Sequence, residues 1–389
     1  MTSNWVKSTL GELSIGGRGY YGIGASAVPY SAELYTYLRI TDINDDGTLN
    51  MSDLKSVSDE KATDYLLKPN DIVFARTGAS TGRNYFYDGT DGEFVFAGFL
   101  IKFSLDPKKV NPRYIKYYCI SKDYRDWVAA FNTGSTRGNI NAQTLASMPI
   151  SLPDRATQNR IVKVLDAIEE KRKSNAKIND NLAELLQTVY QERFGDVSAA
   201  GEQGKLLDIC FYSKDRVAVS ELNTSTYFST ENMLPGKAGA TEAASLPTTP
   251  QTTACHNGDT LISNIRPYFK KIVYCNDECG CSTDVLCFTP VQSKYAAYLF
   301  STLYADKFFA FMVTGSKGTK MPRGDKQQIM SYPVALPSEE ELKEFNALAL
   351  PVLAKIHSNK AENKRLSATR DALLPKLMSG EIDVSDIQF

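Results

Sequence analysis

The longest regular pattern of apolar and polar positions runs from about residue 155 to residue 194, and no Pro or Gly interrupts it before Gly195. Apolar residues recur every seven positions between charged flanks, which is typical of a helix that pairs with another helix. At about 1.5 Å per residue, such a helix would be about 60 Å long. Its two predicted seams contain Ile161, Ile168, Asn175, Leu182 and Val189, and Leu165, Arg172, Asn179 and Leu186.

The same heptad pattern returns 184 positions later. A buried Asn in a helix seam costs stability but fixes register and partner. Because Asn occurs twice at matching positions, we expect the two helices to pair as an antiparallel coiled coil with pseudo-twofold symmetry. Considered alone, the helices could instead form a spacer or a dimerisation coil. The second set is Phe345, Val352, Asn359, Leu366 and Leu373, with Ala349, Ile356, Asn363 and Arg370 in the companion seam.

Pro351 interrupts the second pattern. We expect a short helix after Ser338, capped by Glu341, because Ser followed three residues later by Glu forms a capping box. The main helix would then restart near Pro351, since Pro is tolerated in a first helical turn.

The segments before the two helices also repeat. Residues 114–135 and 295–316 match with a shift of 181 and have aromatic residues at helical spacing that end at a Gly. We expect one aromatic helix in each. Three further blocks keep the same order with shifts of 184, 188 and 185, which makes chance similarity a poor explanation. These blocks are 148–153 with 332–337, 71–74 with 259–262, and 99–103 with 284–288.

The pattern therefore predicts an α+β chain with two similar globular domains, each followed by a long helix. The predicted boundaries are 1–153 for the first globular domain, 154–196 for the central helix, 197–337 for the second domain, and 338–389 for the last helix and tail.

Composition narrows the possible functions. The 389 residues have a formal net charge of −1, whereas DNA-binding proteins that act alone are usually strongly basic. DNA binding would thus need local basic patches. No run of about 18 apolar residues predicts a membrane span, and the first residues lack a secretory pattern, so we expect a cytoplasmic protein. The seven cysteines are odd in number, which disfavours a disulfide framework.

The sequence offers little for catalysis. It contains no phosphate-binding loop of the GxxxxGK[ST] type, and no convincing strand precedes the glycines at 16–24, so we expect these glycines to form turns. The segment NPRY at 111–114 has Arg113 where an amino-methyltransferase motif needs Pro. His256 and His357 are the only histidines. The cysteines between 255 and 287 are irregularly spaced for zinc. We expect no catalytic residue, cofactor or metal.

Several segments resemble the specificity subunit of type I restriction-modification enzymes. PNDIVFARTGASTGR (69–83) and NGDTLISNIRPYFKK (257–271) resemble two versions of one family segment. YFSTENMLPGK (227–237) and FGD (194–196) resemble other recurring segments. NKRLSATRDALLPKLMSGEIDV (363–384) is the most specific match. The two-domain arrangement is similar along essentially the whole chain.

The resemblance implies a non-catalytic subunit whose two target-recognition domains each read one half of a split site on double-stranded DNA. The helices would set the spacer and hold two methyltransferase subunits, and a motor-nuclease subunit would join them. Arg suits guanine and Asn suits adenine, while Gly-Ser loops let amides approach phosphates. The candidate DNA-binding residues are Arg76, Ser80, Arg83, Asn84, Ser135, Arg137 and Asn139 in the first domain, and Arg266, Lys270, Lys271, Ser316, Lys317, Lys320 and Arg323 in the second.

For the methyltransferase, apolar helix positions are the better candidates, although several must pack helix against helix. Two alternatives stay open: a specificity subunit whose partner fuses nuclease and methyltransferase, and a coiled-coil interaction protein that never binds DNA. The candidate partner-binding residues are Ile161, Val164, Ile168, Leu182, Leu185, Val189, Val352, Ile356, Leu366, Leu373, Leu374 and Leu377.

Overall fold

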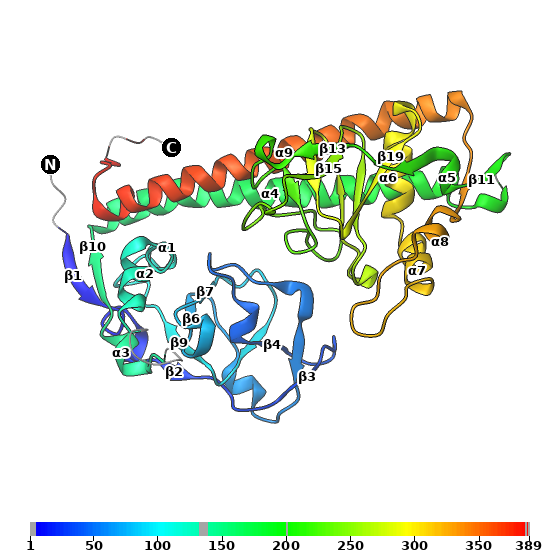
Figure 1. Ribbon diagram of the computed structural model, residues 1–389. Coiled ribbons are helices and arrows are strands. Elements are labelled where there is room, and N and C mark those ends of the chain that lie inside the picture. Colours follow the sequence, from blue (N-terminus) through cyan, green and yellow to red (C-terminus); the bar gives the residue numbers. More distant parts are fainter. Residues whose placement is uncertain (1–4, 132–138, 200, 386, 388–389) are drawn as a thin grey trace. The chain divides into compact units, whose positions relative to one another are not determined.

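The computed structural model describes residues 5–131, 139–199, 201–385 and 387. The chain divides into two compact units, one made of residues 1–172 and 364–389 and the other of residues 173–363. Each unit contains a globular domain, part of helix α4 (Arg155–Phe194) and part of helix α9 (Glu339–Ser379) (Figure 1). The fold class predicted from the sequence, α+β with a long helix after each domain, is confirmed.

Two four-stranded sheets build the globular part of the first unit. In the larger, β6 (Asp71–Ala75) is central and wholly buried. Its side chains alternate between two cores: Ile72 and Phe74 face one, and Val73 and Ala75 face the other, as the two-residue period of a strand requires. The sheet orders are β2 (Tyr20–Tyr21), β9 (Leu100–Ser104), β6 and β7 (Asn84–Tyr87), and β3 (Ala27–Pro29), β5 (Lys55–Val57), β4 (Thr36–Leu38) and β8 (Phe94–Phe96).

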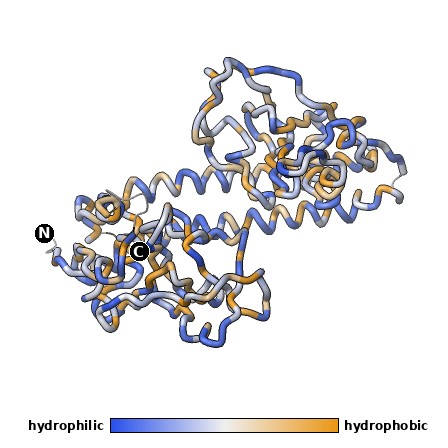
Figure 2. Tube along the Cα trace, turned by 60° about the horizontal axis from the view of Figure 1, so that its bottom comes forward, coloured by the Kyte–Doolittle hydropathy of each residue, from blue (hydrophilic) through white to orange (hydrophobic). Residues whose placement is uncertain are grey.

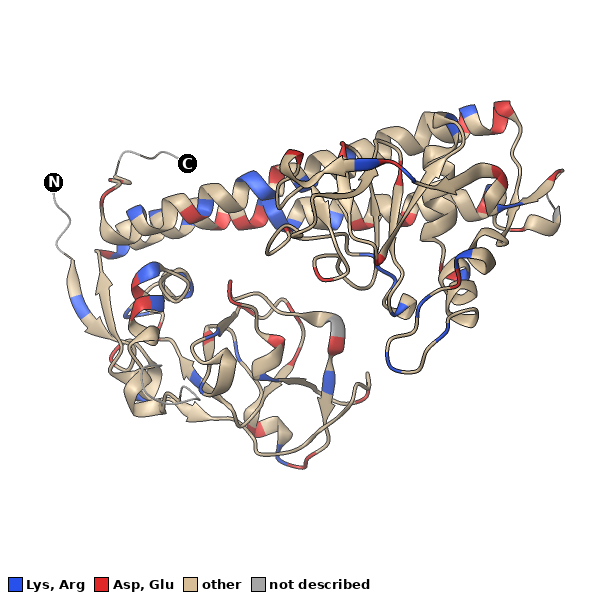
Figure 3. Ribbon diagram, viewed as in Figure 1, with Lys and Arg blue, Asp and Glu red and all other residues tan. Residues whose placement is uncertain are grey.

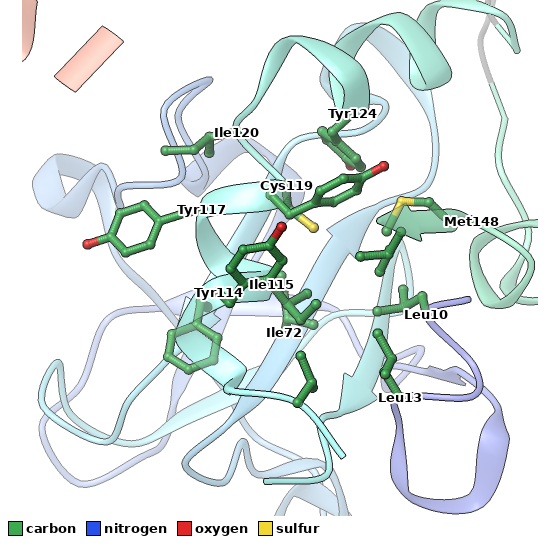
Figure 4. Close-up of a cluster of buried hydrophobic side chains, with 14 of the residues drawn as sticks. Leu10, Leu13, Ile72, Tyr114, Ile115, Tyr117, Cys119, Ile120, Tyr124 and Met148 are labelled. Carbon is green, nitrogen blue, oxygen red and sulfur yellow. The ribbon is translucent and has the colours of Figure 1, made fainter. Parts of the chain in front are cut away.

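Short helices cover one face of β6. Tyr114 and Tyr117 of α1 (Pro112–Tyr118) are fully buried beside Ile72 and Leu10 (Figure 4). The same core includes Ile161 of α4. It thereby joins the sheet to the long helix. The other elements are α2 (Lys122–Ala129), α3 (Ala142–Ala146), and the antiparallel pair β1 (Val6–Thr9) and β10 (Pro149–Leu152).

The second unit repeats this architecture. One sheet has the order β12 (Cys210–Tyr212), β19 (Val285–Pro290), β16 (Thr260–Ser263) and β17 (Ile272–Tyr274); the other has β13 (Arg216–Ala218), β15 (Gln251–Cys255), β18 (Cys279–Cys281) and β14 (Tyr227–Phe228). Strands β11 (Gln203–Lys205) and β20 (Pro333–Ala335) pair as β1 and β10 do. The helices are α5 (Leu206–Ile209), α6 (Ala296–Tyr304), α7 (Asp306–Thr314) and α8 (Lys326–Met330).

The repeat has a different helical register from the one predicted. The starts of α1 and α6, and those of α2 and α7, are each 184 positions apart. The Tyr114 hydroxyl donates to Ser151 O (3.0 Å), as the Tyr298 hydroxyl does to Ala335 O (2.6 Å). The predicted shift of 181 and the single aromatic helix are therefore wrong. A slip of three residues is nearly one helical turn, so aromatic residues match again on the same face.

Helix α4 spans residues 155–194 as predicted, but α9 differs from the prediction because it continues through Pro351. Pro351 lies on the exposed face of α9, while Ala349, Val352 and Leu353 on the opposite side are buried in the second core. That packing maintains the helix despite the missing N–H. Ser338 and Glu341 form the predicted capping box, in which Ser338 N donates to Glu341 Oε2 (2.8 Å).

The two long helices pair antiparallel within each unit, as predicted. In the second unit, Asn175 Nδ2 donates to Asn363 Oδ1 (2.9 Å) and Asn359 Nδ2 donates to Asn179 Oδ1 (2.8 Å). In the first unit, Glu169 accepts from Arg370 at 3.0 Å, and Leu374 and Leu377 join the core that contains Ile161. Hydrophobic and hydrophilic residues alternate along both helices (Figure 2).

Candidate nucleic-acid interface

In the first unit, Arg76 directly follows the buried strand β6. Its N–H donates to Phe99 O (3.0 Å), and its carbonyl accepts from Ile140 N (2.9 Å). The guanidinium carbon lies 5.0 Å from the centre of the Tyr21 ring, a cation–π arrangement. Its Nε is buried and has no hydrogen-bond partner among the described residues. The backbone and the Tyr21 ring thus fix the base of a side chain that is half-exposed.

The next three candidates in the first unit are buried or are bonded to other parts of the domain. Asn84 is 5% exposed and donates to Cys119 O (2.6 Å). Ser80 is also buried. Arg83 Nε donates to Asp45 Oδ1 (2.7 Å) and its Nη1 to Ile43 O. Of these three, Arg83 alone keeps a partly exposed charge, and a carboxylate already partners it.

Of the remaining first-domain candidates, Asn139 lies near the start of α3. Asn139 is exposed and forms an antiparallel bridge with Thr77. This bridge brings Asn139 next to the backbone of Arg76 although the two are distant in sequence. Ser135 and Arg137 lie outside the described residues.

A tight turn in the second unit carries Arg266, Lys270 and Lys271. Arg266 and Lys270 have positive φ angles of 50° and 52°, which are uncommon for residues with a side chain. Lys270 Nζ lies 2.8 Å from Asp306 Oδ1. Lys271 Nζ donates to Thr230 O (2.6 Å), and burial lowers the pKa of its ammonium group. Strained backbone of this kind gathers at functional sites.

The segment between α7 and α8 carries the other second-domain candidates, and Figure 3 colours its Lys and Arg positions blue along the ribbon. Lys317 and Arg323 exchange backbone hydrogen bonds (2.9 and 3.0 Å), so residues 318–322 form the tip of a hairpin. Lys320 at this tip is exposed and has no acidic partner within the part of the chain that the structure describes. Ser316 is half-buried, and its hydroxyl donates to Val313 O (2.7 Å).

Acidic side chains neutralise much of this basic surface. Lys317 pairs with Asp325 (2.6 Å) and lowers the pKa of that carboxyl. Arg323 pairs with Asp284 (3.0 Å). Asp306 has a lowered pKa because Lys237 and Lys270 both donate to it. These pairs orient the basic groups, but they also reduce the attraction that phosphates would feel.

Exposed aromatic side chains beside the basic positions escaped the sequence reasoning. Phe99 is 60% exposed in the turn before β9, next to Arg76. Tyr268 and Phe269 are 50% and 39% exposed in the turn between Arg266 and Lys270. For Tyr268 and Phe269 the available signal was an aromatic residue directly beside a basic candidate in the sequence, whereas Phe99 lies beside Arg76 only in space.

Comparison with known proteins finds similarity to type I specificity subunits. Residues 2–184 match the model of the type I restriction modification DNA specificity domain. The chain is 21% identical over 203 residues to the type I restriction enzyme HindI specificity subunit of Haemophilus influenzae. This match covers 50% of the chain and 41% of that protein. It is 34% identical over 76 residues to the MjaIX specificity subunit of Methanocaldococcus jannaschii, covering 20% and 18%.

The first half of the chain is thus similar to the DNA specificity domain of type I restriction-modification systems. The matched regions are less than half the length of either curated relative. The crystal structure of a type I restriction-modification system S subunit from M. genitalium covers 96% of this chain and 96% of its own, at a TM-score of 0.53 and 17% identity. That likeness shows a common fold.

The long helices expose few of the predicted partner-binding residues. Ile161, Val352, Leu374 and Leu377 are buried in the cores. Leu185 is 46% exposed. Ile178, which the sequence reasoning did not select, is 39% exposed seven residues earlier on α4, and therefore lies on the same face. The half-buried members of the set are Val164, Ile168, Leu182, Val189, Ile356, Leu366 and Leu373.

The seven cysteines are free thiols within the described residues, and all are buried. Cys275 and Cys279 have sulfur atoms 3.5 Å apart, and Cys287 lies 3.2 Å from Asp259 Oδ2. In the described part of the chain, no group of three or more His, Cys, Asp or Glu side chains is arranged to hold a metal ion. None of the helices described has both the length and the hydrophobicity that a bilayer crossing requires.

Proposed function

We propose that this chain is the sequence-recognition subunit of a type I restriction-modification enzyme and has no catalytic activity of its own. Each globular domain would read one half of a bipartite site on double-stranded DNA. The observation that carries the proposal is one framework built twice with different polar groups on it. A structural protein has no need to vary the residues that follow equivalent strands, whereas a reader of an asymmetric site does.

The charge distribution is consistent with a reader that shares DNA with partners. The segment between α7 and α8 contains several basic residues, but the net charge of the chain is −1. Phosphate neutralisation supplies most of the non-specific affinity of DNA-binding proteins. We therefore propose that partner subunits make many of the phosphate contacts. Purified alone, the chain should bind DNA weakly at physiological salt.

We propose that the long helices bind two methyltransferase subunits and that a motor-nuclease subunit completes the complex. Ile178 and Leu185 on one face of α4 suit this role because they are exposed apolar residues without an apparent function in the core. Leu185→Asp should weaken co-purification of the methyltransferase, while Lys177→Asp at a neighbouring exposed position should not. Truncation before Leu373 should also weaken it, but this deletion removes part of the first core as well.

The test is co-expression of the chain with the methyltransferase subunit, followed by DNA-binding measurements. A stable complex that prefers some DNA sequences, and loses that preference when this chain is omitted, is expected. A partner that fuses nuclease and methyltransferase would indicate the related kind of system. A complex that binds all sequences equally, or helices that capture partners without any DNA binding, would contradict the proposal and leave a coiled-coil interaction protein.

A further inference from the structure

The two domains contain three positions that correspond through their backbone contacts. In the first, Arg76 N donates to Phe99 O (3.0 Å), and in the second, Asn264 N donates to Asp284 O (2.8 Å). Ile140 N donates to Arg76 O (2.9 Å), and Gly324 N to Asn264 O (3.3 Å). We call Arg76, Phe99 and Asn139 the first edge, and Asn264, Asp284 and Arg323 the second edge.

The third position of each edge corresponds through a β-bridge. Thr77, which follows Arg76, bridges Asn139. Ile265, which follows Asn264, bridges Arg323 in the same antiparallel sense. Each edge therefore combines the end of a central strand, the turn before its neighbour and the end of the loop after the second short helix.

The residues that support the edges keep their roles in both domains. Asp71 accepts from Lys68 N at 2.8 Å, as Asp259 does from His256 N. Both carboxylates are almost fully buried, at 2% and 1% exposed. Helix α3 begins with Asn141 as its N-cap, and α8 begins with Asp325 in the same role.

By contrast, all three edge positions differ in chemistry between the domains. The first edge combines a cation, an aromatic ring and an amide, whereas the second combines an amide, a carboxylate and a cation. Arg and Asn have exchanged places between the positions of Arg76 and Asn139. Because the backbone contacts are the same in both domains, the guanidinium follows the central strand in the first edge and lies at the end of the loop in the second edge.

Burial determines which of these groups can reach a ligand. Phe99 is 60% exposed and Asn139 is exposed. Arg76 is half-exposed above the Tyr21 ring, and its buried Nε is unpartnered among the described residues. The side chains of Arg323 and Asp284 are 55% and 41% exposed and joined at 3.0 Å. Asn264 is only 8% exposed, so it is part of the buried base of the second edge and is not a group that reaches a ligand.

These groups have the chemistry that reads base edges in the major groove. Arg pairs with O6 and N7 of guanine, Asn with N6 and N7 of adenine, and an apolar ring contacts the thymine methyl group. An Arg that an aromatic ring or a carboxylate already holds loses less conformational freedom on binding.

We propose that the first and second edges determine which base pairs the two domains accept, with Arg76 and Arg323 each reading a guanine at a different place in its half-site. Asp284 is the positioning residue for Arg323. This inference rests on the proposed function, since it names the residues that would carry out the reading.

For the test, the chain and its methyltransferase are expressed together in cells. The methylated bases in the DNA of these cells are then mapped by sequencing, which gives the recognised motif. Arg323→Gln should relax one base position of one half-site by about 5- to 150-fold, and Arg76→Gln should relax one position of the other half-site. Asp284→Asn should relax the same position as Arg323→Gln, which a general loss of stability would not do. Arg216→Gln removes an exposed charge elsewhere in the second unit and should leave the motif unchanged.

Three results would overturn the inference while the proposed function stands. One is an unchanged motif in both Arg variants. Another is a uniform decrease of methylation at every position, which indicates a phosphate contact. The third result concerns Arg323→Lys, which is used if a Gln variant fails to fold. This variant keeps the charge but lacks the paired donors, so it must relax the same position, and an unchanged motif would overturn the inference. Absence of any motif with the unmodified chain would instead reject the proposed function.

Discussion

The hydroxyl of Tyr298 provides a sharp test of the repeat as the structure has it. Tyr298 in α6 is fully buried and donates to the carbonyl of Ala335 in β20 at 2.6 Å. Its ring packs edge-on against Phe194 of α4, with centroids 5.1 Å apart. Tyr298→Phe keeps the ring contacts and removes the hydroxyl. The substitution thus removes the hydrogen bond to Ala335 O, together with the polar contacts of the hydroxyl with Tyr190 and Thr302.

The expected loss follows from the buried carbonyl. The net contribution of a hydrogen bond to the free energy of unfolding is about 0.5–1.5 kcal/mol. Leaving a buried acceptor without a partner raises the loss to about 1–3 kcal/mol. We expect Tyr298→Phe to lower the free energy of unfolding of the second unit by this larger amount. Tyr114→Phe is the counterpart in the first unit, where the Tyr118 hydroxyl also donates to Pro149 O (2.6 Å) in the same strand, β10. Strand β10 should therefore open less readily than β20.

The assay is urea unfolding of the purified chain together with hydrogen exchange of the β11–β20 amides. Tyr295→Phe is the control, because a shift of 181 would align Tyr295 with Tyr114 and no hydrogen bond of its hydroxyl is seen among the described residues. We expect that variant to stay within about 0.5 kcal/mol of the unmodified chain. A larger loss for Tyr295→Phe than for Tyr298→Phe would refute the register of 184.

Three further changes test the packing and the charges. Pro351→Ala should stabilise the second unit by up to about 3 kcal/mol in urea unfolding, since Ala restores a helical N–H on an exposed face; no gain would mean that the helix has adapted to Pro. Phe345→Ala should destabilise it by about 3–5 kcal/mol, because Phe345 is fully buried against Phe194, and a loss below about 1 kcal/mol would contradict that packing. The hydrogen bond to Glu278 raises the pKa of His256, so charged His256 stabilises the fold below its unfolded pKa and stops doing so as the pH rises through the folded value. Its side chain is 43% exposed, so His256→Gln should cost a fraction of a kcal/mol at pH 5 and less at pH 9; equal costs would argue against the shift.

Heptad periodicity was enough to predict the long helices and their pairing. Asn175 and Asn359 could be recognised as register-fixing because each occurs at the same place in an otherwise apolar seam. The bounds of α4 followed from the absence of Pro and Gly before Gly195. The helices and their bounds depend on local sequence, and the tertiary contacts of the structure favour the same helices.

Where tertiary contacts opposed the local signal, prediction failed. Pro351 indicates a helix break in any sequence reading, but the buried neighbours on the opposite face of α9 keep the helix continuous. The shift of 181 failed because aromatic residues recur at nearly one helical turn. The starts of the paired helices and the hydrogen bonds of Tyr114 and Tyr298 show the shift of 184.

The candidate interface was harder to predict than the fold. Residue type alone cannot distinguish Asn84, which is buried and bonded to Cys119 O, from the exposed Asn139. Nor does sequence reveal that Asp284, distant along the chain, orients Arg323. The aromatic Phe99 was missed because its importance comes from its position beside Arg76 in space. Ser135 and Arg137 remain predictions from the sequence.

A map of methylated bases in host DNA, with and without this gene while the methyltransferase is expressed, tests the central claim most directly. The account predicts that methylation disappears from one split motif, two short defined halves around a fixed unspecified gap. Methylation that stays at every motif after the gene is removed would contradict the assignment of this chain as the subunit that reads the sequence.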